Sequence, residues 1–362
     1  MSGRCVHLGG TGLVRTASRR SILGGMAAGA TALAVGMPSG ARAHPTNVDV
    51  AKAKAEGMLT LYFSLDQKIA SAIMKAFQEK YGIEVEYFRA GPADLAAKIF
   101  AEADVSAVVP DMLDISDLSA IAAMKERGLL MAHRSPVADS VPGNLRDPDE
   151  MWIADRLSQS VLQYSTREFN ESTRPNTWAD VAKPAYKNRV AIGVSPNGDG
   201  AWKLYLLAEL LGWDYLKRLA DSNVLRVATP QLMTQVVESG ERGIGLAIND
   251  NIAWRSKADG KPTDYLYPAE GVPAEAGACC LMAGSKHPNA AALFYDWWMG
   301  DEGQALLVAG GKYSSRTSLP PPAGMQSLAG LKLMSIDPQK FRRERTEILQ
   351  KMSDIFGGEW GI

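Results

Sequence analysis

From residue 58 onward the sequence alternates between short apolar runs and longer stretches with helical periodicity. Residues 58–63 are mostly apolar and end at a polar turn, and the following stretch places Ile69, Ile73 and Phe77 four residues apart before Gly82. Apolar residues at this spacing form one face of a helix, and glycine commonly follows a helix end. We therefore predict a strand over 58–63 and a helix that ends before Gly82.

The same alternation continues along most of the chain. The further predicted strands lie at 83–87, 111–115, 189–194 and 244–248, and the further predicted helices at 91–102, 116–128, 201–211, 229–240 and 341–355. Strands that alternate with helices build largely parallel sheets with helices on their faces. The predicted fold class is therefore α/β.

The first 43 residues have the composition of an export signal. Their only charged side chains are five arginines, and Arg19 and Arg20 stand directly before an Ala- and Gly-rich apolar stretch. The paired arginines indicate export by the twin-arginine (Tat) machinery, with cleavage near Ala43. The alternative is a short membrane anchor, but the apolar stretch is shorter than the roughly 20 residues that span a bilayer.

Charge and cysteine content narrow the possible partners and the compartment. Without residues 1–43 the chain has 34 basic and 40 acidic side chains, which argues against nucleic acid or an anionic membrane surface as the main partner. Cys279 and Cys280 are the cysteines that remain. Adjacent cysteines rarely satisfy disulfide geometry, so we expect two buried thiols. Since the residue directly after Ala43 is not a cysteine that could carry a lipid, we expect a protein free in the periplasm.

Several stretches resemble the periplasmic binding proteins of the ferric iron, polyamine and phosphonate importers. They are FQEKYGIEVEY at 77–87, DMLDISD at 111–117 and, above all, residues 283–319. This last stretch has the family's order of Lys-His-Pro, an Ala-rich helix, a Gly-Gln turn and an aromatic-x-x-Arg ending. The resemblance covers about residues 57–357.

The resemblance implies a two-lobed periplasmic-binding-protein fold of type II. Each lobe would be a mainly parallel sheet flanked by helices, with a small ligand clamped between the lobes by hinge closure. An ABC permease in the inner membrane is the implied partner, and a monomer is the implied state, with no cofactor. We expect lobe one at 57–150 plus 266–320 and lobe two at 151–265 plus 321–362.

The candidate ligand residues lie at the turns after the predicted strands. Open α/β sheets bind ligands beyond the carboxyl ends of their strands, against helix N-termini whose free N–H groups suit anions. The candidates are Ser64, Asp66, Arg89, Gly91, Ser116, Asp117, Ser195, Asn197, Gly198, Trp202, Asn249, Asp250, Trp254 and Tyr265. Each of these turns is equally consistent with an ordinary helix cap or loop, and the sequence leaves this alternative open.

The chemistry of the strand that ends near Ile248 favours an organic anion. Ferric members of the family carry adjacent tyrosines after this strand, whereas this chain has INDNIAW at 248–254. Fe(III) prefers anionic oxygen donors, and one aspartate between two asparagines is a poor substitute. We therefore expect a phosphonate, a sugar phosphate or a carboxylate, with ferric iron as the alternative and no metal site in the protein itself.

The sequence gives no support for catalysis. It contains no G-x-S-x-G elbow, no H-E-x-x-H and no phosphate-binding P-loop. A hydrolase with two carboxylates needs no fixed spacing and stays an alternative, as does a sensory receptor that docks to a membrane partner. The prediction is a non-enzymatic solute-binding protein.

Overall fold

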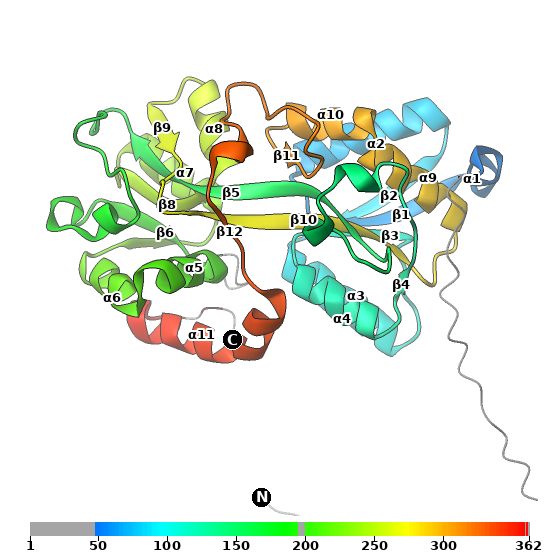
Figure 1. The fold of residues 1–362 in the computed structure, drawn as a ribbon, viewed down its shortest axis with the longest axis horizontal. Coiled ribbons are helices and arrows are strands. Elements are labelled where there is room, and N and C mark those ends of the chain that lie inside the picture. The colour runs from blue at the N-terminus through cyan, green and yellow to red at the C-terminus, as the bar shows by residue number, and fades with distance from the viewer. Residues whose placement is uncertain (1–47, 195–199, 359, 361–362) are drawn as a thin grey trace, which may run out of the picture. The chain divides into compact units, whose positions relative to one another are not determined.

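The computed structural model describes residues 48–194, 200–358 and 360, and Figure 1 shows their arrangement. The predicted export signal lies outside these residues, as do Ser195, Asn197 and Gly198.

The elements that form lobe one are the strands β1 (Met58–Phe63), β2 (Glu84–Arg89), β3 (Met112–Ile115), β4 (Leu130–Met131) and β11 (Tyr313–Ser314), and the helices α1 (Val50–Glu56), α2 (Gln67–Tyr81), α3 (Pro92–Asp104), α4 (Leu118–Glu126), α9 (Pro288–Met299) and α10 (Asp301–Ala309).

Lobe two contains the second set of alternating elements. Its strands are β6 (Val190–Gly193), β7 (Leu225–Val227), β8 (Ile244–Asn249) and β9 (Thr263–Leu266), and its helices are α5 (Ala201–Leu211), α6 (Trp213–Asp221), α7 (Pro230–Ser239), α8 (Asp250–Ala258) and α11 (Pro338–Phe356). The described 3₁₀ helices are η1 (Ala138–Ser140), η2 (Gly143–Leu145), η3 (Ala179–Ala182), η4 (Pro184–Tyr186) and η5 (Leu328–Gly330).

Local sequence signals set several helix ends where the alternation predicts them. Gly82 follows α2 in the left-handed conformation, with a φ of 69°, which glycine adopts without steric cost. The Asp117 side chain accepts a hydrogen bond from the backbone at the start of α4. Thr229 caps α7, and Pro230 occupies its first turn. These caps satisfy N–H groups that a helix start otherwise leaves free.

Two long antiparallel strands join the lobes, and the sequence did not predict them as crossing strands. They are β5 (Ile153–Ser165) and β10 (Val272–Met282), which run side by side from one lobe to the other (Figure 1). Near one end β5 pairs with β10 at Cys279, and near the other it pairs with β8 and β9. The predicted lobe boundaries stay predictions, but these two strands connect the lobes, as does the segment between β11 and α11 (Figure 1).

The strands form a continuous order, β2-β1-β3-β10-β5-β8-β6-β7. On one side β1 runs parallel to β2 and β3, and on the other β6 runs parallel to β7 and β8. In the middle, β10 and β5 pair antiparallel with their neighbours. Each lobe therefore has its own group of parallel strands, whose carboxyl ends share one edge.

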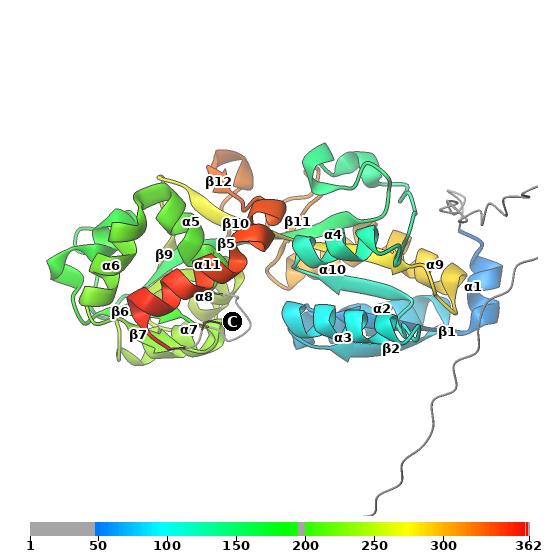
Figure 2. The same ribbon diagram turned by 90° about the horizontal axis from the view of Figure 1, so that it is seen from below.

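Both faces of each sheet are covered by helices, as Figures 1 and 2 show. In lobe one, Phe77 of α2 meets Phe294 of α9 with ring centroids 4.9 Å apart, and α3 and α4 cover the opposite face. In lobe two, Leu349 of α11 packs in the core with α5 and α6, and α7 covers the other face. Each fully buried aliphatic or aromatic side chain contributes about 1.5–3 kcal/mol to folding.

Cys279 and Cys280 are buried free thiols, which confirms the prediction of two buried thiols.

Candidate functional site

The carboxyl ends of β1, β2 and β3 lie at one edge of the lobe-one sheet because these strands are parallel. Ser64 follows β1, Arg89 ends β2 and Ser116 follows β3. The Ser64 N–H donates to the backbone oxygen of Asp114 over 3.0 Å, which ties the turn after β1 to β3. The structure thus brings these three predicted residues to the edge where α/β sheets bind ligands.

Three other predicted residues at this edge also have local roles. Asp66 accepts from the Lys68 N–H and Asp117 from the Ala120 N–H, each over 3.0 Å, so both carboxylates cap their own helices. Gly91 is the N-cap residue of α3 and makes no side-chain cap. Capping accounts for these residues without a ligand, and their ligand contacts stay predictions.

Arg89 and Trp254 both donate to backbone oxygens. The Arg89 Nε group donates to the Leu65 oxygen over 2.8 Å, which holds the β1–α2 turn against the end of β2. The Trp254 Nε1 group donates to the Ala323 oxygen over 3.0 Å. The indole of Trp254 therefore contacts the segment that follows β11, and stacking of this ring on a ligand stays a prediction.

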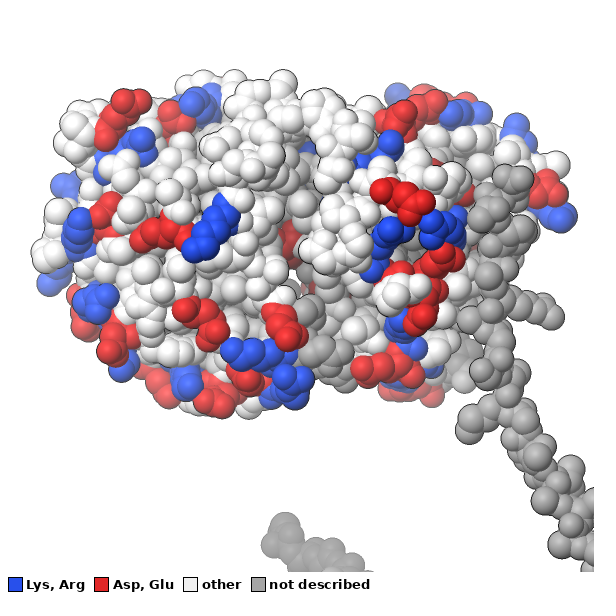
Figure 3. Space-filling view, viewed as in Figure 1, with Lys and Arg blue, Asp and Glu red and all other residues white. Residues whose placement is uncertain are grey.

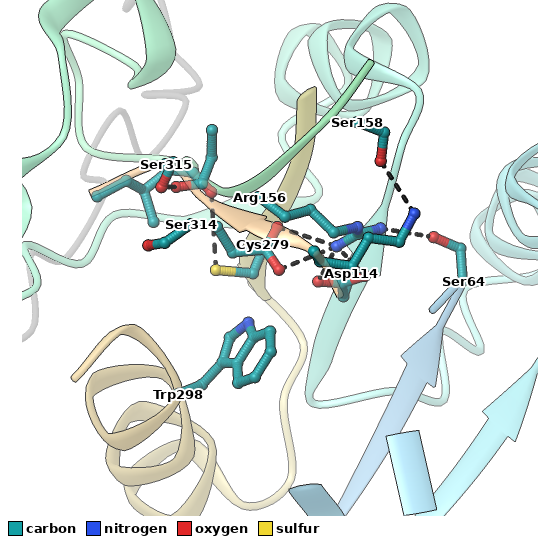
Figure 4. Close-up of polar contacts among 12 residues, drawn as sticks. Ser64, Asp114, Arg156, Ser158, Cys279, Trp298, Ser314 and Ser315 are labelled. Atoms are coloured by element: carbon teal, nitrogen blue, oxygen red, sulfur yellow. Dashed lines mark hydrogen bonds and ion pairs between the residues drawn. The ribbon is translucent and has the colours of Figure 1, made fainter. Parts of the chain in front are cut away.

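A buried ion cluster that the sequence did not predict lies directly behind Ser64 (Figure 4). Arg156 of β5 is 3% exposed, and its Nη1 donates to both oxygens of Asp114 at 2.8 Å and to those of Asp155 at 2.9 Å. Its Nη2 donates to the Ser64 Oγ over 3.0 Å. Asp114 and Asp155 are fully buried. Arg156 therefore has two carboxylate partners and one hydroxyl partner.

Burial and pairing act in opposite directions on the charges of this cluster. Burial raises the pKa of Asp114 well above its ordinary value, although the nearby Arg156 opposes that shift. Burial alone would lower the pKa of Arg156, but the carboxylates of Asp114 and Asp155 together raise it. The guanidinium thus stays charged, and its charge is compensated inside the protein.

The lobe-two side of the site contains Lys203, on the first turn of α5. This lysine is 5% exposed, and its ammonium donates to the Asn249 Oδ1 at the end of β8. The ammonium also lies 5.5 Å from the ring centroid of Trp202. The structure therefore brings the predicted residues Asn249 and Trp202 to the same buried cation.

A second buried lysine lies beside the predicted Asn249-Asp250-Asn251 turn. The Lys312 ammonium donates to the Asn251 Oδ1 and to the Ser158 Oγ, each over 3.0 Å. Lys312 is 9% exposed, and burial lowers its pKa to about 8. The neighbouring Asp250 is 1% exposed, and burial raises its pKa to about 7. Among the described residues, neither Lys312 nor Lys203 forms an ion pair with a carboxylate.

A small pocket lies next to Lys203, between the starts of α5 and α7 and the carboxyl ends of β6 and β8. Its lining includes Gly193, Gly200, Lys203, Pro230, Met233 and Ala247. Ala247 has a φ of 55°, a left-handed conformation that costs a residue with a Cβ atom about 1–2 kcal/mol. A Cβ atom on Gly200 would lie 2.1 Å from the Gly193 oxygen, so only glycine allows this close approach. Strained or close backbone of this kind is common where ligands bind.

Tyr265 belongs to a group of aromatic side chains near Asp250. Its ring lies 5.9 Å from that of Tyr267, whose hydroxyl is 3.1 Å from the hydroxyl of Tyr313 and 3.3 Å from the Asp250 Oδ2. Burial raises the pKa of Tyr265 to about 12 and also raises that of Tyr267 and Tyr313. Burial thus favours the neutral form of these phenols in the ligand-free protein.

A larger cavity of about 290 Å³ lies elsewhere in lobe one, under the segment that leads into β5. The charged side chains around it have carboxylate partners: Arg134 pairs with Glu150 and Asp139, and Arg146 also pairs with Asp139. This cavity therefore presents no uncompensated charge, in contrast to the lysines near the β8 end. The described residues contain no group of three or more His, Cys, Asp or Glu side chains that could hold a metal ion.

Comparison with known proteins identifies the family. A family model described as bacterial extracellular solute-binding protein matches residues 59–311. The chain belongs to this family. Among the helices described, the solute-binding protein has none that is both long and apolar enough to cross a membrane.

Two curated relatives are each 24% identical to the solute-binding protein over the aligned residues. One is an uncharacterized protein of Haemophilus influenzae, aligned over 70% of this chain and 76% of the relative. The other, from Sinorhizobium fredii, is named probable ABC transporter periplasmic-binding protein y4fP and aligns over 71% of this chain and 74% of the relative.

Solved structures show the same fold. Iron-bound HitA from Pseudomonas aeruginosa superimposes with a TM-score of 0.72 at 23% identity, covering 82% of this chain and 99% of HitA. AfuA from Actinobacillus pleuropneumoniae, solved with fructose-6-phosphate bound, gives a TM-score of 0.71 at 24% identity and covers 83% and 98%. The solute-binding protein thus has the two-lobed type II periplasmic-binding-protein fold that its sequence predicts.

Sequence reasoning located the strand ends of the site but missed Arg156, Lys203 and Lys312. Charged side chains are expected at the surface unless a partner is known, so none of the three was singled out. One signal was present for Lys203, which lies inside the strongly apolar run 201–208 of α5. A lysine in the middle of such a run has to be either paired or functional.

Proposed function

We propose that this protein is the periplasmic solute-binding component of an ABC importer and that it captures a small organic anion. The solute would be a phosphonate, a sugar phosphate or a carboxylate, held between the lobes by hinge closure and then delivered to the permease. The y4fP relative is named as a periplasmic-binding protein of an ABC transporter, which supports the importer. AfuA, with its bound fructose-6-phosphate, supports a solute of this chemical class.

The observation that carries this proposal is the pairing of two buried lysines with neutral oxygens. Lys203 donates to an asparagine, and Lys312 donates to an asparagine and a serine. Burying an ammonium group is costly unless an opposite charge accompanies it. An anionic solute would supply that charge, and the amide and hydroxyl groups would keep the ammonium groups in place until it arrives.

The two lysines also belong to one electrostatic neighbourhood. Arg156 and Lys203 both lower the pKa of Lys312, while Asp250 and Glu275 raise it. Burial is nevertheless the largest effect and lowers the pKa. A ligand anion beside Lys312 would reverse this shift, and charge-assisted hydrogen bonds to buried groups contribute about 1.5–3 kcal/mol each.

Ferric iron is the alternative cargo, because HitA contains iron and shares the fold. In this chain the hydroxyls of Tyr267 and Tyr313 come together beside the carboxylate of Asp250, so that phenol and carboxylate oxygens lie close to one another. Burial favours the neutral phenols over the phenolates that Fe(III) prefers. These oxygens are also hydrogen-bonded to one another, so the anionic solute agrees better with the site.

The binding experiment compares solutes and lysine variants by isothermal titration calorimetry. Fructose 6-phosphate, methylphosphonate, citrate, spermidine and ferric citrate are titrated into the protein from residue 44 onward. We expect one organic anion to bind, and Lys203→Gln and Lys312→Gln each to weaken it by about 1.5–3 kcal/mol. The exposed Lys217→Gln is the matched control and should bind as the wild type does. Binding of ferric citrate alone would contradict the proposal, and so would an anion affinity that neither Lys203→Gln nor Lys312→Gln weakens.

We further propose that the protein is exported by the Tat machinery, is cleaved near Ala43 and acts as a non-enzymatic monomer. Arg19 and Arg20 precede the apolar stretch of residues 1–43. Because the Tat machinery recognises the paired arginines, the Arg19→Lys/Arg20→Lys variant should stay in the cytoplasm, as measured by fractionation and immunoblot. An unchanged periplasmic yield would point to a different export route.

A further inference from the structure

The Ser64 hydroxyl has a fixed hydrogen-bonding partner on its protein side. Its Oγ lies 3.0 Å from Nη2 of Arg156 (Figure 4). A guanidinium has only donors, so the serine oxygen is the acceptor in this bond. The serine has one proton left to donate, and the sheet edge after β1 is where this proton can meet a solute.

Arg156 is itself held in place from several sides. Asp114 and Asp155 accept from its Nη1, and all three side chains are buried. The guanidinium also lies over the backbone of Gly277 in β10, where a Cβ atom would be 2.2 Å from the Arg156 Cζ. Arg156 and Asp155 lie on β5 and Gly277 on β10, so the hydrogen bond to Ser64 forms where the strands that join the lobes meet β3 and the turn after β1.

We propose that Arg156 is a positioning residue that fixes the orientation of the Ser64 hydroxyl, so that its proton is directed at an acceptor oxygen of the solute. Phosphoryl, carboxylate and sugar hydroxyl oxygens can accept this proton. This inference rests on the proposed capture of an organic anion and adds how one of its contacts is positioned. Ser64 touches the solute, whereas Arg156 acts only through Ser64.

The physical reason lies in the hydrogen-bonding groups of a serine hydroxyl. It has one proton and two lone pairs, and without a fixed partner it rotates among several orientations. With one lone pair taken by Arg156, the proton has to point away from the guanidinium. Fixing this orientation before the solute arrives lowers the entropy that is lost on binding.

The test is a double-mutant cycle on Ser64 and Arg156, read by calorimetric affinity for the tightest binder among fructose 6-phosphate, methylphosphonate and citrate. We expect Ser64→Ala to weaken binding about tenfold and Ser64→Thr to restore most of that loss, because threonine keeps the hydroxyl. Arg156→Lys should weaken binding by a similar factor, and it should have no further effect in the Ser64→Ala background. Ser172→Ala, at an exposed turn, is the control for the loss of a serine hydroxyl.

The outcomes separate this inference from the proposed function. If Arg156→Lys weakens binding equally in both backgrounds, Arg156 does not act through Ser64 and the inference is wrong while anion capture stands. If none of the three anions binds the wild type, anion capture fails, and the inference fails with it. Should Arg156→Lys not fold, Gly277→Ala displaces the same guanidinium and gives the same cycle.

Discussion

The two polar clusters of the site differ in how their buried charge is compensated. In lobe one, the guanidinium of Arg156 contacts the carboxylates of Asp114 and Asp155 at 2.8–2.9 Å. At the end of β8, the ammonium groups of Lys203 and Lys312 contact neutral oxygens. In the first cluster carboxylates pair directly with the cation, whereas in the second, among the described residues, Asp250 and Glu275 act on Lys312 without forming an ion pair.

This difference assigns different tasks to the two clusters. A compensated cluster resists change, because removing one member leaves a buried charge without a partner. Buried ammonium groups without a directly paired carboxylate cost free energy in the ligand-free protein, and an anion that bound beside them would offset that cost. On the face shown in Figure 3, acidic and basic side chains are interspersed. Under the proposed function, the lysine cluster is the part of the site that attracts the anion.

The largest expected effect is a difference in the free energy of unfolding between a variant of the arginine cluster and a variant of the lysine cluster. Arg156→Met removes the partner of two buried carboxylates and should destabilise the ligand-free protein by about 3–5 kcal/mol. Lys312→Met removes an ammonium held by neutral groups and should change the free energy of unfolding by no more than about 1 kcal/mol, or raise it. Urea denaturation of both variants without ligand measures the contrast. Equal losses in the two variants would show that Lys312 is compensated after all.

The pH dependence of stability and of anion affinity tests the same comparison between the two clusters. The pKa of Lys312 is lowered from 10.5 to about 8, so between these values the unfolded chain holds a proton that the folded protein has released. Stability relative to Lys312→Met should therefore rise from pH 8 to pH 10.5, by up to about 3 kcal/mol. Anion affinity should fall over the same range, because Lys312 loses its charge.

Denaturation and calorimetry at pH 7, 8, 9 and 10 check these opposite trends. Wild type minus Lys312→Met is the relevant difference at each pH, since titrating groups far from Lys312 contribute equally to both proteins. Asp250 is the exception, because the charge of Lys312 lowers its pKa. Asp250, whose pKa is raised to about 7, adds a slope of the opposite sign below pH 7, where stability falls as pH rises. A difference that stays flat above pH 8 would place the ammonium in a better-solvated environment than the structure shows.

The smallest expected effect concerns the backbone of the pocket next to Lys203. Ala247 has a φ of 55°, so Ala247→Gly should relieve strain and raise the free energy of unfolding by about 0.5–1 kcal/mol after the greater chain entropy of glycine is subtracted. The exposed Ala72→Gly in the interior of α2 is the control and should lower it by about 1 kcal/mol. Thermal and urea unfolding measure both. A loss of stability in Ala247→Gly would mean that the methyl group packs more favourably than its backbone strain costs.

Much of the fold was predictable because its signals are local. Gly82, Asp117 and Thr229 mark helix ends within a few residues, and the structure confirms them. The crossing strand β5 was missed because Arg156 and Gln163, both buried, interrupt the apolar alternation that identifies a half-buried strand. Polar residues buried by distant partners cannot be told from exposed ones by pattern alone.

The sequence by itself determined the α/β alternation, the helix ends and the strand ends at which a solute can bind. Only the tertiary structure decided which charges meet there. Arg156 and Ser64 are 92 positions apart, and Lys312 and Asn251 are 61 apart. The charge state and the free-energy cost of a buried cation depend on the solvent it has lost and on the groups within a few ångströms. Neither quantity exists until the chain has folded.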